Sequence, residues 1–549
     1  MTVEDTIEED ELDNEIDNDM KELRMKVETL LLPKVMKKTK NLDDFIKFGR
    51  YTVLILFLAE FVCLSTLSTM IFMVYAGHNP SITGCGDVHF DPSLNHTERC
   101  RMFRELQSNN SCKPEMEYQF KSINIEFDLL CEKAGSVKTS TMMQMTGVFL
   151  GALTFGQFSD ICGRRFSLLI AVTCSAVCTA QSAYVQTMLQ FNIARIATGF
   201  FAGGITAVQG VYTIENIPAR HRMLINTLVT WSPNFIIYPI MAYFAHEWRR
   251  LALMSALVNV LGVITLIFCY ESPRFLIQKG RIGEARRVLT RIRQFNRDSC
   301  ENRSQEIEEM LMAEKEAFVE ANKKHHTFMT IFKNAELFKW TAVLCFGIMT
   351  TSLINYGILF NMDSLVGSLY LNNIIFGIIR WSLNIMVGFA DFKIKALGRK
   401  ILNTGSEVAN LACLVFILMV YYFEEEKAFA NSLRIITILV TAACGQVYIA
   451  KYITATELYP TSIRNLGCSA QAMFSRIGTI LSTQLFLFDS FHDSFPYFIL
   501  CAFLFTDIML FQLTIPETKG RKLENHLQKR VRRRDVESKG RLVERTGRQ

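Results

Sequence analysis

The stretch ELYPTSIR, residues 457–464, decides the fold, because ENIPARHR at residues 215–222 has the same pattern. Glu, Pro and Arg stand at the same three positions in both stretches. Two further pairs occur in the same order: GQFSDICGRR (156–165) with ADFKIKALGRK (390–400), and YESPRF (270–275) with PETKG (516–520). Each pair is separated by roughly 240 residues, and such a fixed offset indicates an internal repeat. The sequence therefore predicts two equivalent halves that run in parallel.

The chain between these stretches is strongly apolar. It has 549 residues, of which 50% are hydrophobic and 42 are Phe, and its mean hydropathy is +0.19 although 20% of its residues are charged. The apolar residues form blocks of about 20, the length that crosses a bilayer core as an α-helix. About twelve such blocks are present, six in each repeat: 51–76, 139–158, 166–184, 188–210, 224–244, 251–270, 339–360, 368–391, 401–422, 432–453, 465–487 and 494–514. The predicted fold class is an all-α integral membrane protein with twelve transmembrane helices in two parallel six-helix halves.

Basic residues collect in alternate loops, which predicts that these loops and both termini are cytoplasmic. The net charge of +6 therefore reflects membrane orientation, and the lipid bilayer, not a nucleic acid, is the expected partner. The polar first fifty residues argue against a cleavable signal peptide. Five segments are predicted: an acidic cytoplasmic segment at 1–50, the first half at 51–270 with an outer loop at 77–137, a cytoplasmic helical loop at 271–337, the second half at 338–515 and a basic cytoplasmic tail at 516–549.

The outer loop carries four cysteines and two glycosylation sequons. The sequons begin at Asn95 and Asn109, whereas a third, at Asn302, falls in the cytoplasmic loop and should stay unmodified. Cysteines beside glycosylation acceptors indicate an oxidising compartment, so two disulfides are expected in one of three pairings. The four cysteines are Cys85, Cys100, Cys112 and Cys131.

The stretch after the second span resembles the signature of the major facilitator superfamily. Gly156 would permit close helix approach, Gly163 a tight reversal, and Asp160 could face a neighbouring helix N-terminus. The resemblance implies that this loop closes and opens an inner gate; the alternative is a basic turn that only sets topology. In the second half Asp391 stands seven residues before Gly398 instead of three, which leaves an equivalent gate there in question. The gating residues expected from the motif and its repeats are Asp160, Gly163, Arg164, Arg165, Glu215, Arg222, Glu457 and Arg464.

A closer resemblance extends over nearly the whole chain. The segments that carry it are LDDFIKFGRYT, the cysteine loop ending in FDLLCE, YESPRFLIQKGR, INYGILFN, ELYPTSIRNLG and SRIGTILS. They are similar to the organic cation, anion and zwitterion transporters, whereas sugar porters share ESPR and PETKG without the large cysteine loop. The resemblance implies a plasma-membrane carrier of a small organic ion, with a counter-ion or a proton as candidate co-substrate.

Three basic residues within the predicted spans are the candidate substrate cations: Arg380, Lys451 and Arg476. An arginine at mid-membrane costs about 2.5–3.5 kcal/mol on insertion scales, so it must face protein or water. In similar carriers of cations the position of Arg476 is an aspartate, and in carriers of anions or zwitterions it is an arginine; the position of Arg380 is commonly acidic. The other ionisable residues in or near the spans are Glu60, Arg195, Asp391, Glu407 and Asp507.

Aromatic and polar residues complete the expected site. Tyr448 and Tyr452 stand one turn apart on either side of Lys451 and so share a helix face. Together with Tyr356 they match positions where the similar carriers have cavity-lining aromatics. Asn384 stands about one turn after Arg380, where anion carriers have a lysine, so the pocket need not be identical.

Several interpretations stay open at this point. Organic anions are the favoured substrates, a zwitterion or cation (carnitine-like) carrier is the alternative, and a non-transporting receptor or scaffold is the third reading. Arg476 could instead form an internal salt bridge, for instance with Glu60. The sequence shows no phosphate-binding glycine loop, nucleophile motif or ordered metal-ligand cluster, so we expect no enzyme activity, cofactor or metal.

Overall fold

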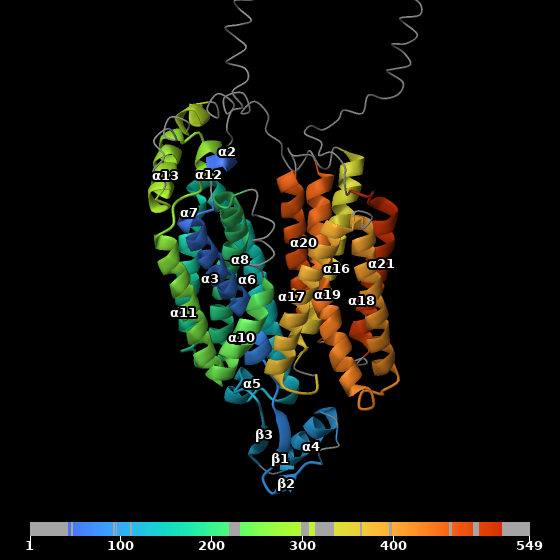
Figure 1. Ribbon diagram of the computed structural model, residues 1–549. Helices are drawn as coiled ribbons and strands as arrows, with labels where there is room; N and C mark the ends of the chain where they lie inside the picture. Colours follow the sequence, from blue (N-terminus) through green and yellow to red (C-terminus); the bar gives the residue numbers. More distant parts are fainter. Residues whose placement is uncertain are drawn as a thin grey trace, which may run out of the picture.

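The structure is a computed structural model of the full chain. Its described residues are 42–45, 48–91, 94, 96–109, 112–218, 231–297, 307–312, 334–362, 365–394, 398–459, 464–486 and 494–518. Figure 1 shows two helical bundles side by side, the first half in blue to green and the second in yellow to red.

Six long helices form each bundle, and all twelve coincide with the predicted spans. In the first half they are α3 (Arg50–Ala76), α6 (Gly135–Cys162), α7 (Arg164–Ser182), α8 (Met188–Asn216), α10 (Trp231–Ala245) and α11 (Trp248–Ile267). In the second half they are α16 (Ala335–Phe360), α17 (Leu369–Lys393), α18 (Arg399–Tyr422), α19 (Ala430–Leu458), α20 (Arg464–Leu485) and α21 (Phe495–Thr514). Nine of the described helices are long and apolar enough to cross a membrane on composition alone. The other three are α6 and α20, which are rich in Gly, Ser, Thr and Gln, and α10, of which 15 residues are described. The predicted fold class is confirmed.

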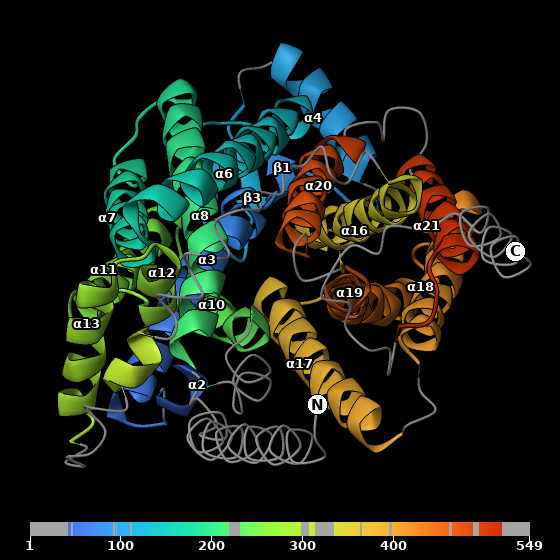
Figure 2. The same ribbon diagram turned by 90° about the horizontal axis from the view of Figure 1, so that it is seen from above.

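The two halves meet along three helix pairs. Helix α10 packs against α17, α6 against α20, and α3 against α16, as the view in Figure 2 also shows. The largest apolar cluster contains residues of both halves, such as Tyr75 and Tyr356. At the end nearest the cysteine loop, Gln119 accepts hydrogen bonds from the Leu369 amide at 2.8 Å and from the Tyr370 hydroxyl at 3.0 Å. Tyr370 also stacks on Tyr75 at 6.0 Å between ring centroids, so the halves are held together at this end.

Helices α6 and α8 pack in close backbone contact. Gly147 and Gly151 on α6 face Gly199 and Gly203 on α8, a small-xxx-small spacing on both helices. A Cβ at any of these four positions would meet backbone atoms of the partner helix. Such spacing lets helices approach where no hydrophobic driving force acts between them. The pair therefore forms a rigid unit in the first half.

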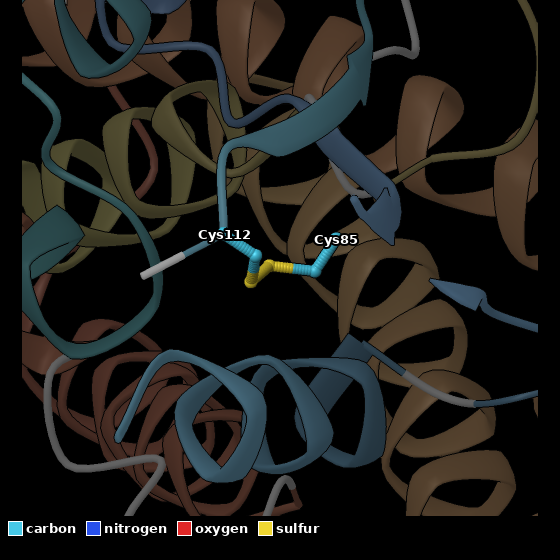
Figure 3. The surroundings of a disulfide bond; sticks show 2 residues. All are labelled: Cys85 and Cys112. Atoms are coloured by element: carbon cyan, nitrogen blue, oxygen red, sulfur yellow. A yellow bond between two sulfur atoms is a disulfide. The ribbon is translucent and has the colours of Figure 1, made fainter. Parts of the chain in front are cut away.

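The outer loop folds into a small domain at one end of the molecule. Strands β1 (Ser81–Cys85), β2 (Val88–His89) and β3 (Pro114–Glu117) form an antiparallel sheet in the order β2-β1-β3, next to α4 (His96–Asn109). Disulfides join Cys85 to Cys112, shown in Figure 3, and Cys100 to Cys131. The expectation of two disulfides is confirmed. The sequence left three pairings open, and the structure has the pairing Cys85–Cys112 and Cys100–Cys131. Helix α5 (Ile123–Glu126) and the 3-10 helix η1 (Cys131–Ala134) lead from this domain into α6.

Short helices cover the opposite end of the first half. They are α2 (Leu42–Phe45), α12 (Pro273–Gln278) and α13 (Ile282–Phe295). Ala285 and Leu289 of α13 are buried in a cluster with Ile307 and Leu311. The described part of the predicted loop at 271–337 therefore contains helices, as expected.

Candidate functional site

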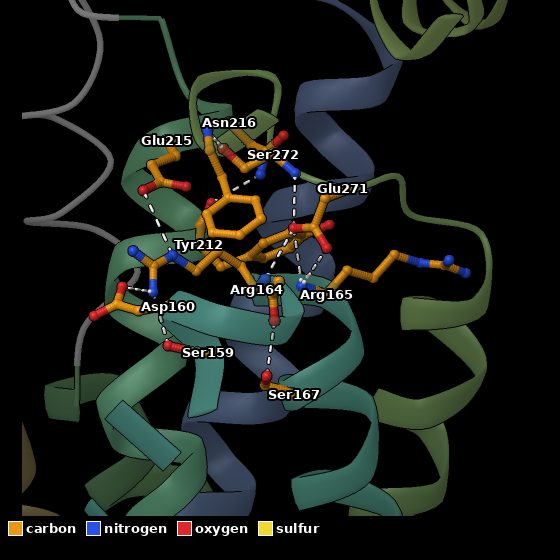
Figure 4. A network of polar contacts seen from close by, with 12 residues as sticks. Ser159, Asp160, Arg164, Arg165, Ser167, Tyr212, Glu215, Asn216, Glu271 and Ser272 are labelled. Atoms are coloured by element: carbon orange, nitrogen blue, oxygen red, sulfur yellow. Dashed lines mark hydrogen bonds and ion pairs between the residues drawn. The ribbon is translucent and has the colours of Figure 1, made fainter. Parts of the chain in front are cut away.

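The GQFSDICGRR and YESPRF stretches contribute to a polar network at the end of the first half that lies away from the loop domain (Figure 4). Glu271 of the YESPRF stretch accepts hydrogen bonds from the backbone amides of Arg164 at 3.0 Å and of Arg165 at 3.1 Å. These amides open helix α7, whose N-terminus has no intrahelical acceptors for them and carries the positive end of the helix dipole. Glu271 thus caps α7 and ties it to the end of α11.

The Arg164 side chain joins three helices. Its guanidinium pairs with Asp160 at 2.6 Å on α6 and lies 3.8 Å from Glu215 on α8. It also lies over the Phe275 ring, 5.3 Å from the centroid. Asp160 remains 62% exposed, and none of these ion pairs reaches a described residue of the second half. The network is therefore complete within the first half and leaves one carboxylate accessible.

The second half repeats this network. Glu517 of the PETKG stretch accepts from the backbone amides of Arg399 at 2.9 Å and Lys400 at 3.1 Å, at the start of α18. Arg399 pairs with Glu457 at 3.2 Å, as Arg164 does with Glu215. Glu271 and Glu517 were not predicted as site residues. The available signal was that each is the second residue of its repeated stretch.

Gly163 and Gly156 of the gate motif have different surroundings. Gly163 has φ 110°, a left-handed backbone that favours glycine, and a Cβ there would lie 2.6 Å from Glu271 Oε2. The expectation that Gly156 allows close helix approach is wrong, because a Cβ at this position would meet nothing within 4 Å. Arg222 lies outside the described residues, as do the side chains of Arg464 and Asp391.

Replacing Asp160 by Asn is expected to slow turnover more than it weakens substrate binding. The carboxylate is exposed in this conformation, and neutralising it removes an interaction whose strength differs between access states, which shifts their balance. Initial rates of uptake across a range of substrate concentrations, normalised to surface protein, separate the two effects. Asp87→Asn, at an exposed loop position, is the matched control. An unchanged maximal rate at normal surface level would contradict a gating role.

Arg380 of α17 lies where the two halves meet. Its Nη1 donates to Asn355 Oδ1 on α16 at 3.3 Å. Its guanidinium carbon lies 5.5 Å from the ring centroid of Phe235, on α10 of the first half, and 5.8 Å from that of Phe376. Gly445 makes room for this group, since a Cβ there would come within 3.1 Å of it. Arg380 Nε is buried without a hydrogen-bond partner, and no carboxylate among the described residues pairs with this cation.

Arg476 of α20 is half-buried and makes no ion pair or hydrogen bond with any residue that the structure describes. Its chain neighbour Ser475 shares a hydrogen bond with Ser352 at 2.7 Å, and Ser352 shares another with the Tyr448 hydroxyl at 2.5 Å. Tyr448 stands three residues after Gly445 on α19, and the Arg380 guanidinium lies beside Gly445. Hydroxyl groups therefore connect the surroundings of the two arginines.

The remaining expected site residues surround this region. Tyr356 is buried on α16 and interacts with Arg380. Tyr452 lies one turn beyond Tyr448 with 53% of its surface exposed. Asn384 donates to Ser232 Oγ of the first half at 3.0 Å and accepts from Gln446. Asn384 thus contributes a contact between the halves in place of a positive charge.

Lys451 does not border the substrate site as expected. Its ammonium pairs with Glu407 at 2.9 Å and with Asp507, and the side chains of all three are 0% exposed. Lys451 is enclosed between α16, where it donates to Thr351 at 3.4 Å, and α18 and α21, which supply its counter-charges. The prediction for Lys451 is corrected accordingly: its charge is neutralised within the second half.

Two ionisable residues in spans of the first half, Arg195 and Glu60, are bound to neutral side chains. Arg195 is fully buried and donates to Gln144 Oε1 at 2.9 Å, with its guanidinium 4.4 Å from the Phe72 centroid. Glu60 lies against Asn234 of α10 and pairs with neither Arg195 nor Arg476. The internal salt bridge considered for Arg476 is therefore absent among the residues described. No group of three or more His, Cys, Asp or Glu in the described ranges could hold a metal ion.

Comparisons with known proteins agree with this architecture. The family profile described as "Sugar (and other) transporter" matches residues 99–528. Solute carrier family 22 member 7 of Mus musculus is 26% identical over 446 residues, covering 79% of this chain and 78% of the mouse protein. The organic cation transporter protein of Drosophila melanogaster is 25% identical over 435 residues, covering 77% of each chain. Among solved structures, the proton:xylose symporter XylE bound to 6-bromo-6-deoxy-D-glucose has a TM-score of 0.60 at 16% identity, covering 86% of this chain and 98% of XylE.

The profile spans most of the chain, and the XylE structure supports the fold. The relatives are transporters and not enzymes. The two six-helix halves, the duplicated Glu–Arg networks and these matches lead to one assignment. The chain therefore belongs to the sugar (and other) transporter family, has the major facilitator fold, and is similar in sequence to members of solute carrier family 22.

Proposed function

We propose that the chain is a secondary active transporter that moves small organic anions across the plasma membrane by alternating access. The observation that carries this proposal is the uneven pairing of the three cations in the second half. Lys451 has two carboxylate partners, whereas Arg380 and Arg476 have none among the described residues. Uncompensated positive charge at the junction of the halves favours a negatively charged solute.

The chemistry of the two arginines suits a carboxylate. A guanidinium binds a carboxylate through two parallel hydrogen bonds, which an ammonium cannot match. The aromatic rings of Phe235, Tyr356 and Tyr448 lie beside Arg380 and would supply the apolar walls of a small-molecule site. The halves contribute unequally: the first supplies an aromatic face and the second supplies the charge.

Alternating access draws support from the distribution of contacts. Gln119 and Tyr75 connect the first half to Tyr370 at the loop-domain end. The Asp160–Arg164–Glu215 network at the opposite end stays within its own half. Among the described residues, the polar contacts that join the two halves at an end of the bundle are those at the loop-domain end, which supports a carrier open at the opposite end. The intact network argues against a non-transporting receptor or scaffold.

A zwitterion carrier is the second candidate, because of Glu60. This carboxylate is half-buried on α3, lies against Asn234 beside Phe235, and has no basic partner in the described part of the chain. It could bind the cationic end of a zwitterion whose carboxylate binds an arginine. The Drosophila relative is named an organic cation transporter, so a pure cation is also included among the substrates to be tested.

An uptake panel in transfected cells tests the proposal. Labelled monocarboxylates, dicarboxylates, a betaine-like zwitterion and a quaternary ammonium are compared with the same cells lacking the protein. We expect uptake of carboxylates above the control and none of the quaternary ammonium. Selective uptake of the zwitterion would establish the second candidate, and uptake of the cation alone would contradict both.

Glycosidase digestion tests the membrane orientation. Asn95 and the side chain of Asn109 lie outside the described residues, but both sequons belong to the disulfide-bonded loop, which an oxidising compartment favours. We expect Asn95→Gln and Asn109→Gln each to increase the gel mobility of the mature protein, and Asn302→Gln to leave it unchanged. A mobility that glycosidase does not alter would contradict an outward-facing loop and cytoplasmic termini.

A further inference from the structure

Three ionisable side chains are sealed between helices of the second half, apart from the substrate residues. Lys451 of α19 pairs with Glu407 of α18 at 2.9 Å and with Asp507 of α21, and none of the three side chains is exposed. Helix α16 closes the fourth side, where a Cβ at Gly347 would lie 2.5 Å from Lys451 Nζ and from Asp507 Oδ1. We refer to Glu407, Lys451 and Asp507 as the buried triad.

The acids of the triad have more acceptor oxygens than the lysine satisfies. Lys451 donates to Asp507 and to the Thr351 hydroxyl at 3.4 Å, and its Nζ lies 2.9 Å from Glu407 Oε1. Both oxygens of Glu407 and Asp507 Oδ1 are buried and have no hydrogen-bond partner in the described part of the chain. A buried carboxylate oxygen without a donor is unfavourable when ionised and acceptable when its group is protonated.

The charges of the triad do not balance. One ammonium faces two carboxylates, so full ionisation would leave a net negative charge enclosed in the membrane interior. Helix α16 contributes only Gly347 and Thr351, which are neutral. In the described part of the chain, the Cys444 thiol of α19 is also near this region, where it accepts a hydrogen bond from Asn410 of α18. A single additional proton on one carboxylate makes the group electrically neutral.

We propose that the buried triad is a proton-binding site that takes up one proton per transport cycle, so that the carrier is a proton symporter of its anionic substrate. The step is the addition of one proton from water to one carboxylate oxygen of Glu407, and its reversal releases that proton on the other side. Substrate monoanion and proton together carry no net charge. This inference rests on the proposed function, because coupling requires a transported solute.

A short polar path connects the triad with the substrate residues. Lys451 donates to Thr351, and the next residue of α16, Ser352, shares hydrogen bonds with Tyr448 and Ser475. Ser475 precedes Arg476 in the chain. A change in the packing of α16 against α19 and α20, as access alternates, therefore reaches the triad and the arginine together. The triad is sealed in the present conformation, which suits a loaded proton held away from water.

The first test needs no substrate. If the native protein holds one proton that the unfolded chain releases, its stability decreases as pH rises. We expect the melting temperature of the purified full chain to fall with pH more steeply in the wild type than in Glu407→Gln and in Asp507→Asn. Each of these variants leaves one cation and one carboxylate. Glu425→Gln, an exposed loop carboxylate, should follow the wild type. Equal slopes in all four proteins would overturn the proton site.

The second test uses proteoliposomes and a carboxylate that the wild type takes up. With one proton per substrate, a gradient of one pH unit, acidic on the side of entry, should raise accumulation by about tenfold. In Glu407→Gln and Asp507→Asn the ratio of uptake with and without the gradient should fall close to unity. If the wild type takes up the anion equally with and without the pH gradient, proton symport is refuted and the proposed function is retained. A pH-dependent melting temperature without uptake of any anion would instead refute the proposed function and retain the proton site.

Discussion

Replacing Lys451 by Met is expected to abolish normal surface expression. The change removes the only cation among the described residues that contacts Glu407 and Asp507, and leaves both acids buried. Removing one partner of a buried ion pair destabilises proteins by about 3–5 kcal/mol, a large part of the stability of most domains. Surface biotinylation and fluorescence-detected size exclusion would measure the loss.

The matched rescue variant combines Lys451→Met with Glu407→Gln and Asp507→Asn. Neutral side chains of similar volume remove the stranded charges, so we expect much of the surface expression to return. If Lys451→Met instead reaches the surface normally and loses only anion uptake, Lys451 is a substrate cation after all, and its enclosure by the two acids has been misjudged.

Replacing Arg476 by Ala is expected to reduce carboxylate uptake most strongly among the substrate-site changes. A hydrogen bond to a charged group contributes about 1.5–3 kcal/mol, which corresponds to roughly 10- to 150-fold in apparent affinity. Because Arg476 has no partner in the described structure, its removal strands no acid, and folding should be preserved. Arg476→Lys should recover only part of the uptake, since the bidentate geometry is lost.

Arg380→Ala should rank second. Arg380 already donates to Asn355 and packs against Phe235 and Phe376, so part of its binding capacity is used within the protein. Uptake of an anion and of an uncharged analogue, each normalised to surface protein, ranks the two variants. A larger effect of Arg380→Ala, or an equal loss for the uncharged analogue, would contradict the expected ranking.

The helical framework could be predicted from the sequence because a helix that crosses a membrane must be predominantly apolar over about 20 consecutive residues. Apolar blocks of span length placed all twelve helices, including α6 and α20, whose polar residues weaken the signal. The repeat also carried structural information. Glu215 and Glu457 are the first residues of the two repeated stretches, and each pairs with the arginine at the start of an earlier helix of its own half, Arg164 or Arg399.

Contacts between helices could not be predicted in the same way. Lys451 was placed by its angle relative to Tyr448 on one helix, but its environment is set by Glu407 and Asp507 from two others. A single sequence does not show how those two helices are rotated about their axes, and so which of their side chains face Lys451. Similarly, Gly156 has open space beside it, whereas Gly147 and Gly151 of the same helix lie against the backbone of α8. Which glycine faces a partner depends on the packed arrangement.

The most direct test of the central claim is uptake of a carboxylate by proteoliposomes that contain equal amounts of wild-type protein and of the Arg380→Ala/Arg476→Ala double variant. The claim is that these two arginines, which lack carboxylate partners in the described structure, bind the negative group of the substrate. The account predicts that the double variant reconstitutes normally and loses carboxylate uptake by more than about tenfold. Undiminished carboxylate uptake by the double variant would contradict it.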